Sequence, residues 1–377
     1  MIETFIRRKY MDFRNIRGSR MCRKIVVFES DDWGSIRMPD KETYFCLLRN
    51  GVRVDNCPFM RYDSLATEQD LSLLFEVLYS YRDIRDNPPV LTANCVMANP
   101  DFKKISENNF SEYFYELVPE TLRRYPQCTT SWELWKTGIR NRLFYPQFHG
   151  REHLNVSRWM KSLRTNLPET RLAFDLNVFG ISKAITYENR DSYMEAYSID
   201  TSDDYDKIIS VIIEGLGLFR DKFDFSSDSF IAPNYVWPSI IEKTLKEEGV
   251  RYIQGQRIQF SPDPITGRVK KISHYTGQRN KYGLIYTVRN CAFEPSLNDK
   301  LDWVDECLAQ VNSAFRCRKP AIITSHRLNF IGAIDPSNRD RNLIKFRNLL
   351  KTILFKWPDV EFMSSPELGK QIDLQLL

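Results

Sequence analysis

The sequence predicts a one-domain β/α barrel of about seven or eight parallel strands, and three observations lead to this fold class. Short apolar runs alternate with amphipathic stretches, which is the order expected of a parallel sheet covered by helices. Polar clusters directly follow several apolar runs, where barrels build their active sites at strand ends. The chain has 377 residues and no low-complexity linker, so a single barrel can account for its length.

Nine short apolar runs are candidate strands. They are Lys24–Glu29, Val90–Val96, Phe144–Phe148, Arg171–Phe174, Phe230–Ala232, Tyr252–Gly255, Leu284–Val288, Ala321–Thr324 and Val360–Met363. The stretches between them carry helix signals. Thr67 followed by Asp70 predicts a capping box, with Asp in place of the usual Glu. Pro238 and Gly249 flank a predicted helix over Ser239–Glu248, and Asn338–Phe355 has one apolar side.

The expected domain organisation is simple. Residues 1–20 form a basic N-terminal extension, and residues 21–377 form the barrel domain. Residues 101–142 are rich in helix formers and aromatic side chains and are expected to form a helical insertion beside the barrel mouth. The extension is interpreted as a solvated segment, with contact to anionic lipid or a partner as the alternative.

Composition excludes several classes of protein. The net charge of +5 is small and is spread along the chain, which argues against a nucleic-acid partner. Eight cysteines without a C-x-x-C pair indicate reduced thiols and not a disulfide framework. No apolar stretch of about 18 residues is present to span a bilayer, and no secretory signal is recognisable. We therefore expect a cytoplasmic protein, with peripheral association at the inner membrane face as an option.

The strongest chemical signal is the combination of two acidic residues with two histidines. Asp31 and Asp32 follow the apolar run at Ile25–Phe28, and His149 and His153 follow another such run. A carboxylate and two neutral imidazoles are ligands that zinc accepts, with a position left open for water. Neighbouring carboxylates repel each other unless their roles differ, so one can bind the metal while the other acts as general base. Surface histidines and a helix-capping Asp pair are the plain alternatives.

Further candidates follow other strand-like runs. His326 carries an imidazole, a group that ordinarily titrates near neutral pH and suits a general acid. Arg289 can orient a catalytic carboxylate through a bidentate bond, or form a structural ion pair with Glu294. His274 is expected at the surface. The predicted substrate-binding residues, chosen because they lie beside these clusters, are Trp33, Asn234, Tyr235, Trp237 and Arg289.

At these residues the chain resembles the polysaccharide deacetylase family (carbohydrate esterase family four), which includes the nodulation-type chitooligosaccharide deacetylases. The resemblance implies a distorted (β/α)7 barrel similar to a TIM barrel. It also implies that Asp31 is the general base and that Asp32, His149 and His153 bind one divalent metal, zinc or alternatively cobalt or nickel. His326, in Ser325-His326, matches the late histidine motif that supplies the general acid.

Two departures from the family pattern stand out. Gly150 occupies the place of a Ser or Thr in the second motif, His149-Gly150-Arg151-Glu152-His153. The third motif normally carries an Arg that orients the base, and its nearest match, Ile231–Pro238, has none. Arg289 or Arg327 is then needed to take over that role. With these departures, the chain looks like a divergent branch of this family.

The resemblance implies a metal-dependent hydrolase that removes N- or O-linked acetyl groups from a polysaccharide or glycan precursor. One alternative is a glycoside hydrolase on a related barrel, since paired carboxylates with aromatic platforms also suit that chemistry. The other is a catalytically inactive carbohydrate-binding protein, which the missing third-motif Arg favours. The sequence leaves the sugar, the native metal and the oligomeric state open.

Overall fold

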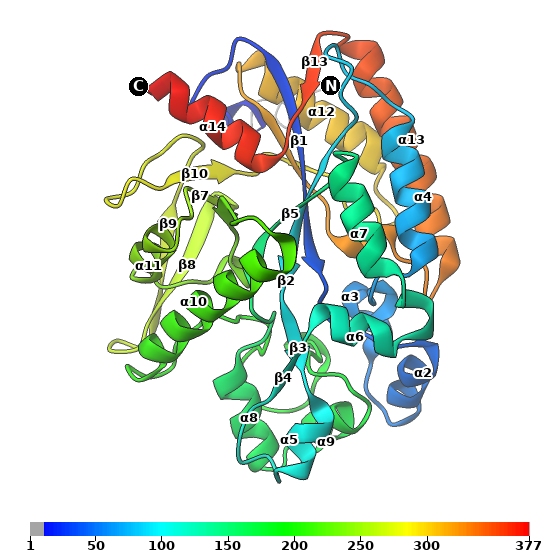
Figure 1. Cartoon of the computed structure of the whole chain (residues 1–377), viewed down its shortest axis with the longest axis vertical. Coiled ribbons are helices and arrows are strands. Elements are labelled where there is room, and N and C mark those ends of the chain that lie inside the picture. The colour runs from blue at the N-terminus through cyan, green and yellow to red at the C-terminus, as the bar shows by residue number, and fades with distance from the viewer. Residues whose placement is uncertain (1–10, 377) are drawn as a thin grey trace.

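A computed structural model describes residues 11–376, and its centre is a curled parallel sheet surrounded by helices (Figure 1). The sheet has nine strands in the order β10-β7-β6-β5-β2-β1-β12-β11, with β13 paired to β1, and every pairing in it is parallel. These strands are β1 (Lys24–Trp33), β2 (Leu91–Val96), β5 (Phe144–Gly150), β6 (Ser229–Phe230), β7 (Tyr252–Gly255), β10 (Ile285–Val288), β11 (Cys291–Ala292), β12 (Ala321–Thr324) and β13 (Val360–Phe362). The predicted barrel class is confirmed as a curled half-barrel.

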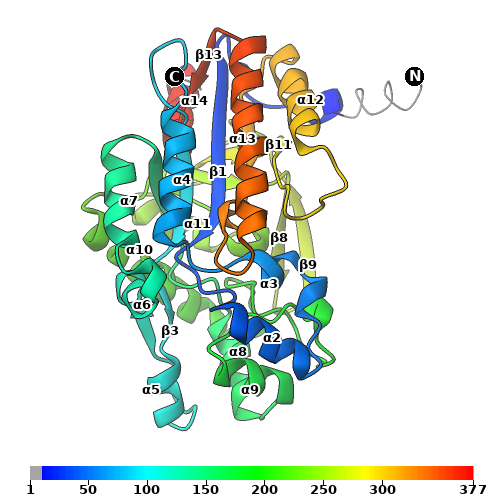
Figure 2. The ribbon, with the colours of Figure 1, turned by 90° about the vertical axis from the view of Figure 1, so that its right-hand side faces the viewer.

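Helices cover the outer face of this sheet. On one side α12, α13, α4 and α7 pack next to one another in that order (Figures 1 and 2). The larger helices are α2 (Lys41–Arg49), α4 (Glu68–Tyr79), α7 (Ser131–Arg140), α8 (Val156–Arg164), α9 (Pro168–Asp175), α10 (Asp204–Phe223), α12 (Trp303–Arg316), α13 (Pro336–Lys356) and α14 (Ser365–Leu376). Shorter ones are α3 (Pro58–Tyr62), α5 (Phe102–Glu107), α6 (Val118–Arg124) and α11 (Ile241–Glu247).

The predicted capping signals act as expected. The Thr67 side chain accepts a hydrogen bond from the Asp70 backbone N–H, and the Asp70 carboxylate accepts one from the Thr67 backbone N–H, which completes a capping box at α4. Asp40 caps α2 by accepting from the Thr43 backbone N–H at 2.7 Å. Because Asp40 is the cap of α2, the pair Asp31–Asp32 is not needed for capping this helix.

One predicted strand is wrong. Arg171–Phe174 lies inside α9, which has Pro168 in its first turn and buries Ala173 and Phe174 against the core. A four-residue apolar run fits either element, and here the helix prevails because the buried residues lie on one helical face. Two short antiparallel strand pairs were not predicted: β3 (Ala98–Pro100) with β4 (Tyr115–Leu117), and β8 (Ile258–Asp263) with β9 (Arg268–Ser273).

Inside the half-barrel, the side chains change from apolar to polar from the amino ends of the strands to their carboxyl ends. At their amino ends, α14 lies across the sheet, and its Leu368 and Ile372 pack in one apolar cluster with Ile25 and Val27 of β1 (Figure 1). Side chains two apart on a strand share a face, so Glu29 continues this inward row above the apolar floor. The carboxyl ends of the strands lie opposite α14, and the candidate residues gather there.

The sheet does not close, because its path ends at β10 on one side and at β11 on the other. An N-terminal segment, residues 11–20, packs beside this opening. Asn290, between the two edge strands, donates to the Asn15 side chain at 2.8 Å, and the Ser19 backbone N–H donates to the Thr276 carbonyl at 2.8 Å. The first ten residues of the predicted basic extension lie outside the described residues.

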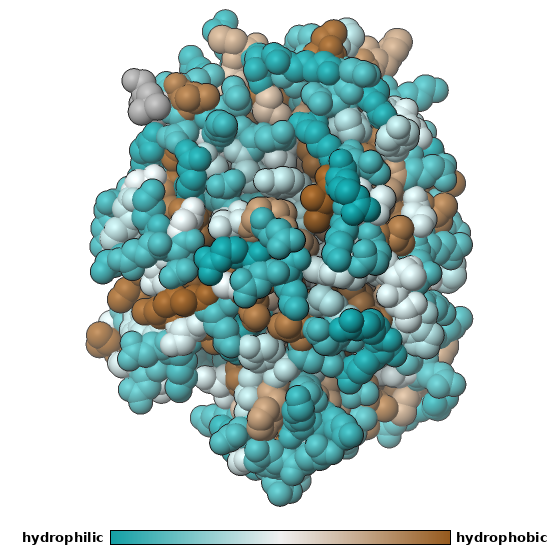
Figure 3. Space-filling view, viewed as in Figure 1, coloured by the Kyte–Doolittle hydropathy of each residue, from teal (hydrophilic) through white to brown (hydrophobic). Residues whose placement is uncertain are grey.

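The remaining composition-based expectations concern cysteines and membrane spans. All eight cysteines are free thiols. Within residues 11–376, no helix combines the length and apolar character needed to cross a membrane. The face shown in Figure 3 is mostly hydrophilic, with separate apolar patches.

Candidate metal and catalytic site

The two adjacent aspartates point into the same cavity because β1 is irregular at its end. Neighbours on a regular strand face opposite sides of the sheet. Here the register of β1 against β2 shifts between Ser30 and Trp33, and Asp32 has φ +76°. Such a bulge redirects a side chain at the cost of backbone strain. Asp31 and Asp32 therefore both line one cavity of about 320 Å³ at the carboxyl ends of the strands.

The two histidines also reach this cavity through an irregular strand end. The register between β2 and β5 shifts at His149, and His153 lies in the loop before α8 and not on a helix. Gly150 has φ +144°, and a Cβ there would lie 2.8 Å from the Glu152 carbonyl oxygen and 3.0 Å from the Tyr197 hydroxyl. A side chain at this position would force the turn to shift, which accounts for glycine in place of Ser or Thr.

Asp32, His149 and His153 form a buried cluster whose ligand atoms all lie within 4.8 Å of one another. The Asp32 Oδ1 atom is 3.4 Å from His149 Nε2 and 3.2 Å from His153 Nε2. Ligand atoms around a tetrahedral zinc lie about 3.3–3.4 Å from one another, given metal–ligand bonds of about 2.0–2.1 Å. The spacing of this donor set therefore fits a divalent metal.

The protonation states fit a metal as well. His149 Nδ1 lies 2.9 Å from the Ile231 carbonyl, which only accepts, so Nδ1 carries the proton and the buried Nε2 is left with a lone pair and no hydrogen-bond partner. Burial, together with the Arg37 charge, lowers the pKa of His153 to about 4, which keeps this imidazole neutral. Burial raises the pKa of Asp32, but the Arg37 guanidinium beside it holds that pKa well below its ordinary value.

Arg37 is a site residue that the sequence interpretation missed. Its Nη2 donates to Asp32 Oδ2 at 3.1 Å, on the oxygen that faces away from the histidines. Behind it, Asp63 Oδ2 lies 3.8 Å from Arg37 Nε, and Asp63 Oδ1 accepts from Arg327 Nε at 2.9 Å. The available signal was a charged residue between two apolar ones in Ile36-Arg37-Met38, because a buried charge needs a partner.

Arg289 takes the orienting role for Asp31. Its Nη1 donates to Asp31 Oδ2 and its Nη2 to Asp31 Oδ1, each at 2.6 Å, while its Nε donates to Glu29 at 2.6 Å. Asn94 donates to Asp31 Oδ1 at 2.7 Å. Burial alone raises the pKa of Asp31, but the Arg289 guanidinium holds it far below the ordinary range. Asp31 is therefore ionised and fixed in one orientation. Arg327 does not contribute to this orientation, because it pairs with Asp63.

His326 lies opposite this carboxylate and is oriented by Glu294. His326 Nδ1 is 2.7 Å from Glu294 Oε1, and His326 Nε2 is 3.8 Å from Asp31 Oδ2. Burial lowers the pKa of His326, but attraction by Glu294 and Asp31 outweighs it and raises the pKa to about 9. Glu294 thus forms no ion pair with Arg289. Instead, Glu294 orients His326, and Arg289 orients Asp31.

Asn234 and Tyr235, two of the predicted substrate-binding residues, line the cavity. Both have left-handed backbone conformations, with φ +54° and +58°. This turn brings the Tyr235 hydroxyl to 3.0 Å from Arg289 Nη1, from which it accepts a hydrogen bond. Arg289 itself lies behind Asp31 and does not line the cavity.

Three sequence-based expectations need correction. Trp33 is 1% exposed and packs edge-to-face against Trp135 and Phe144, so it is a core residue. Trp237 is also 1% exposed, and its Nε1 donates to Glu242. Neither tryptophan reaches the cavity. His274 is buried and not at the surface, because it is sandwiched between Trp237 and Tyr286.

Fold and site together define a parallel α/β half-barrel with a buried Asp–His–His cluster at its mouth. No protein-family model matches the chain, and no curated protein matches its sequence. One similar solved structure, a candidate glycoside hydrolase or deacetylase from Parabacteroides distasonis, is 8% identical with a TM-score of 0.49, covering 93% of this chain and 71% of its own. A candidate polysaccharide deacetylase from Mycobacterium smegmatis is 12% identical with a TM-score of 0.45, covering 96% of each chain.

A third similar structure is the 4-alpha-glucanotransferase from Thermococcus litoralis, 10% identical with a TM-score of 0.42. The match covers 92% of this chain, which spans only 40% of the length of that protein. Polysaccharide deacetylases are thus among the solved structures that this chain resembles. At these identities the likeness concerns the fold.

Proposed function

We propose that this protein is a metal-dependent hydrolase that removes acetyl groups, N- or O-linked, from a polysaccharide or glycan precursor. The observation that carries the proposal is the placement of five side chains around one cavity. Asp32, His149 and His153 offer three ligand atoms within 4.8 Å of one another, and Asp31 and His326 face the same space. The barrel domain over residues 21–377 would be the catalytic unit.

A divalent metal held by Asp32, His149 and His153, zinc or alternatively cobalt or nickel, would supply Lewis acidity toward the attacking water and the acetyl carbonyl. The chain's own residues supply proton transfer. Asp31 is ionised, and Arg289 and Asn94 fix its orientation. It is thus placed to accept a proton from a water in the cavity.

His326 completes the reaction by donating a proton to the departing sugar amine or hydroxyl. Its raised pKa, about 9, keeps it protonated at neutral pH, which a general acid requires. The Glu294 bond to Nδ1 directs Nε2 toward Asp31 and the cavity. Acid and base therefore both border the cavity in which the reacting carbonyl would lie.

The test combines metal analysis with product analysis. We expect purified protein supplied with zinc to bind one equivalent of metal and to release acetate from acetylated oligosaccharides. His149→Ala and His153→Ala should lose the metal, whereas Asp31→Asn should keep it and lose about 10²–10⁴-fold in rate. His274→Gln is a matched control, because this histidine lies outside the cluster. Retention of metal after removal of both cluster histidines would refute the ligand assignment.

The products separate this proposal from its alternatives. New reducing ends without free acetate would indicate a glycoside hydrolase. Binding of a glycan with neither product, in the presence of zinc, cobalt or nickel, would indicate an inactive carbohydrate-binding protein. The orientation of Asp31 by Arg289 removes the specific reason to favour the inactive alternative, since the missing third-motif Arg has a replacement.

A further inference from the structure

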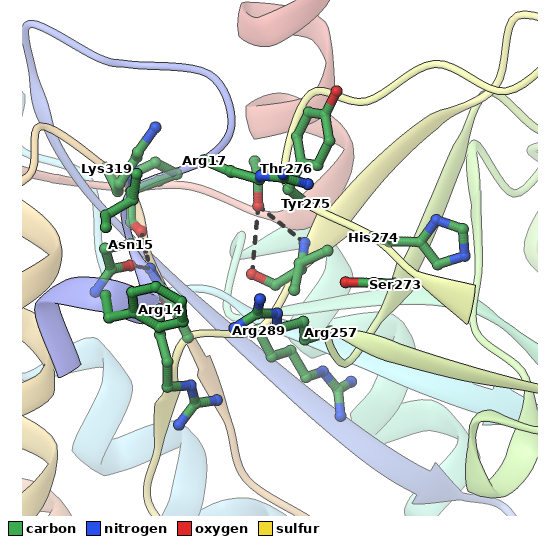
Figure 4. A pocket seen from close by; sticks show the side chains of 15 residues that line it. Arg14, Asn15, Arg17, Arg257, Ser273, His274, Tyr275, Thr276, Arg289 and Lys319 are labelled. Carbon is green, nitrogen blue, oxygen red and sulfur yellow. Dashed lines mark hydrogen bonds between the residues drawn. The ribbon is translucent and has the colours of Figure 1, made fainter. Parts of the chain in front are cut away.

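A second cavity, of about 440 Å³, lies beside the opening of the half-barrel and shares no lining residue with the candidate active site. It lies between the N-terminal segment, the loops after β7, β9 and β10, and the residues just before β12. Figure 4 shows Arg14, Asn15 and Lys319 on one side of it and Ser273 and Tyr275 on the other. Its volume is within the range of small-molecule sites.

The walls of this cavity are strongly cationic. Arg14, Arg17, Arg257, Arg289 and Lys319 line it, and among residues 11–376 no Asp or Glu does. Arg289 is already neutralised by Asp31 and Glu29, and buried Lys319 donates to the Gly18 and Ser19 carbonyls. His274 contributes no charge to the interior, because its ring points away from the cavity in Figure 4 and burial lowers its pKa.

The other three guanidinium groups have no such neutralisation. Within residues 11–376, Arg14, Arg17 and Arg257 form no ion pair with a carboxylate; the Arg257 guanidinium lies 5.7 Å from the Phe13 ring. Elsewhere the molecule pairs its arginines readily, as at Arg53, Arg124 and Arg158. Three unneutralised guanidiniums beside one buried ammonium therefore make a concave region of concentrated positive potential.

We propose that this cavity binds the phosphate group of an anionic ligand. Guanidinium forks match phosphate oxygens in bidentate geometry, and a phosphate monoester or diphosphate carries enough charge to engage more than one of them, unlike a single carboxylate. Phe13 and Ile16, which are 59% and 62% exposed at the rim, add apolar surface for the remainder of the ligand. A soluble phosphate ester and a phospholipid headgroup share this chemistry.

The experiment measures binding by the full chain, with pyrophosphate as the soluble probe and phosphatidylcholine vesicles with or without phosphatidic acid as the lipid probe. The test variant is Arg14→Gln with Arg257→Gln, and neither arginine side chain makes a hydrogen bond within the described residues. The matched control, Lys41→Gln with Arg49→Gln, removes the same charge from exposed positions on α2. Thermal unfolding of both variants should match that of the unmodified chain.

We expect the unmodified chain and the control to bind pyrophosphate equally in calorimetric titration, and the test variant to bind at least about tenfold more weakly, since it loses two charge-assisted contacts. A second outcome is sedimentation with phosphatidic acid vesicles but no binding of pyrophosphate. If this sedimentation is lost in the test variant and kept in the control, the phosphate group belongs to a lipid. Absence of binding to either probe, or equal weakening in both variants, would overturn the proposal. None of these readings depends on hydrolytic activity, so they stand apart from the proposed function.

Discussion

Arg289 and Asp31, 258 residues apart in the chain, are joined by two parallel hydrogen bonds of 2.6 Å. The same guanidinium donates to Glu29 at 2.6 Å, so one cation bridges two buried carboxyl groups of β1. Because Arg289 directly follows β10, its position depends on the curling of the sheet that brings β10 toward β1. The fold itself thus supplies the orientation of the candidate base.

Replacing Arg289 should therefore affect both stability and rate. Arg289→Met leaves Asp31 and Glu29 buried without a cation, and we expect a loss of about 3–5 kcal/mol in the free energy of unfolding. Arg289→Lys keeps the charge but not the fork, so it should be less destabilised while acetate release falls by about 10²-fold through misorientation of Asp31. Denaturant unfolding and steady-state kinetics measure the two effects. Exposed Arg49→Met is the control, and an Arg289→Lys variant of full activity would show that the fork is unnecessary.

The sequence alone was sufficient to predict the parts of this arrangement that follow from local residue patterns. Alternating apolar runs predict the parallel strands, and the polar residues that follow them predict one shared rim, because parallel strands end on the same side. It was not sufficient for partners chosen by tertiary packing. Whether Arg289 would pair with Glu294, five positions away along the chain, or with Asp31 depends on how far the sheet curls, and no local pattern encodes that.

The pair His326–Glu294 predicts a pH dependence. In the proposed reaction His326 acts as the acid and must be protonated, so activity should persist at neutral pH and fall as the pH rises through about 9. Glu294→Gln keeps the shape and an acceptor but removes the charge that raises the pKa of His326, so this alkaline fall should move toward the ordinary imidazole value of 6.5, by at least about one pH unit. The pH–rate profile of acetate release measures it. An unmoved alkaline limb in Glu294→Gln would assign that limb to another group.

The same pair also predicts how the stability of the protein changes with pH. Because folding raises the pKa of His326, its protonated form stabilises the native state fully below the unfolded value, and this contribution disappears as the pH rises through about 9. Glu294→Gln should therefore lose stability at neutral pH relative to the unmodified chain, and the difference should shrink above pH 9. Urea unfolding at a series of pH values tests this without any substrate.

Gly150 offers a test of the strained turn between the two histidines. Gly150→Ser restores the residue type of the related motif, yet its Cβ would approach the Glu152 carbonyl to 2.8 Å at φ +144°. We expect a loss of about 1–3 kcal/mol in stability and weaker zinc binding, because the turn must shift His149 or His153. Gly217→Ala, in the middle of α10 with open space around it, is the matched control and should be neutral or stabilising. A Gly150→Ser protein with unchanged zinc affinity would show that the turn adapts.

Arg37 gives the last prediction, since its positive charge lies beside the proposed metal. Its Nη2 is 3.1 Å from Asp32 Oδ2 and 3.5 Å from His153 Nε2, so it both neutralises Asp32 in the metal-free protein and repels an incoming cation. Arg37→Met should therefore destabilise the metal-free protein but tighten zinc binding, giving a larger rise in unfolding temperature on addition of zinc. Arg37→Lys retains the charge and should keep zinc affinity near that of the unmodified chain. Competition titration with a chelator measures the affinities. Weaker zinc binding in Arg37→Met, by the factor of about 10–100 typical of lost supporting contacts, would instead mean that Arg37 mainly orients Asp32 for the metal.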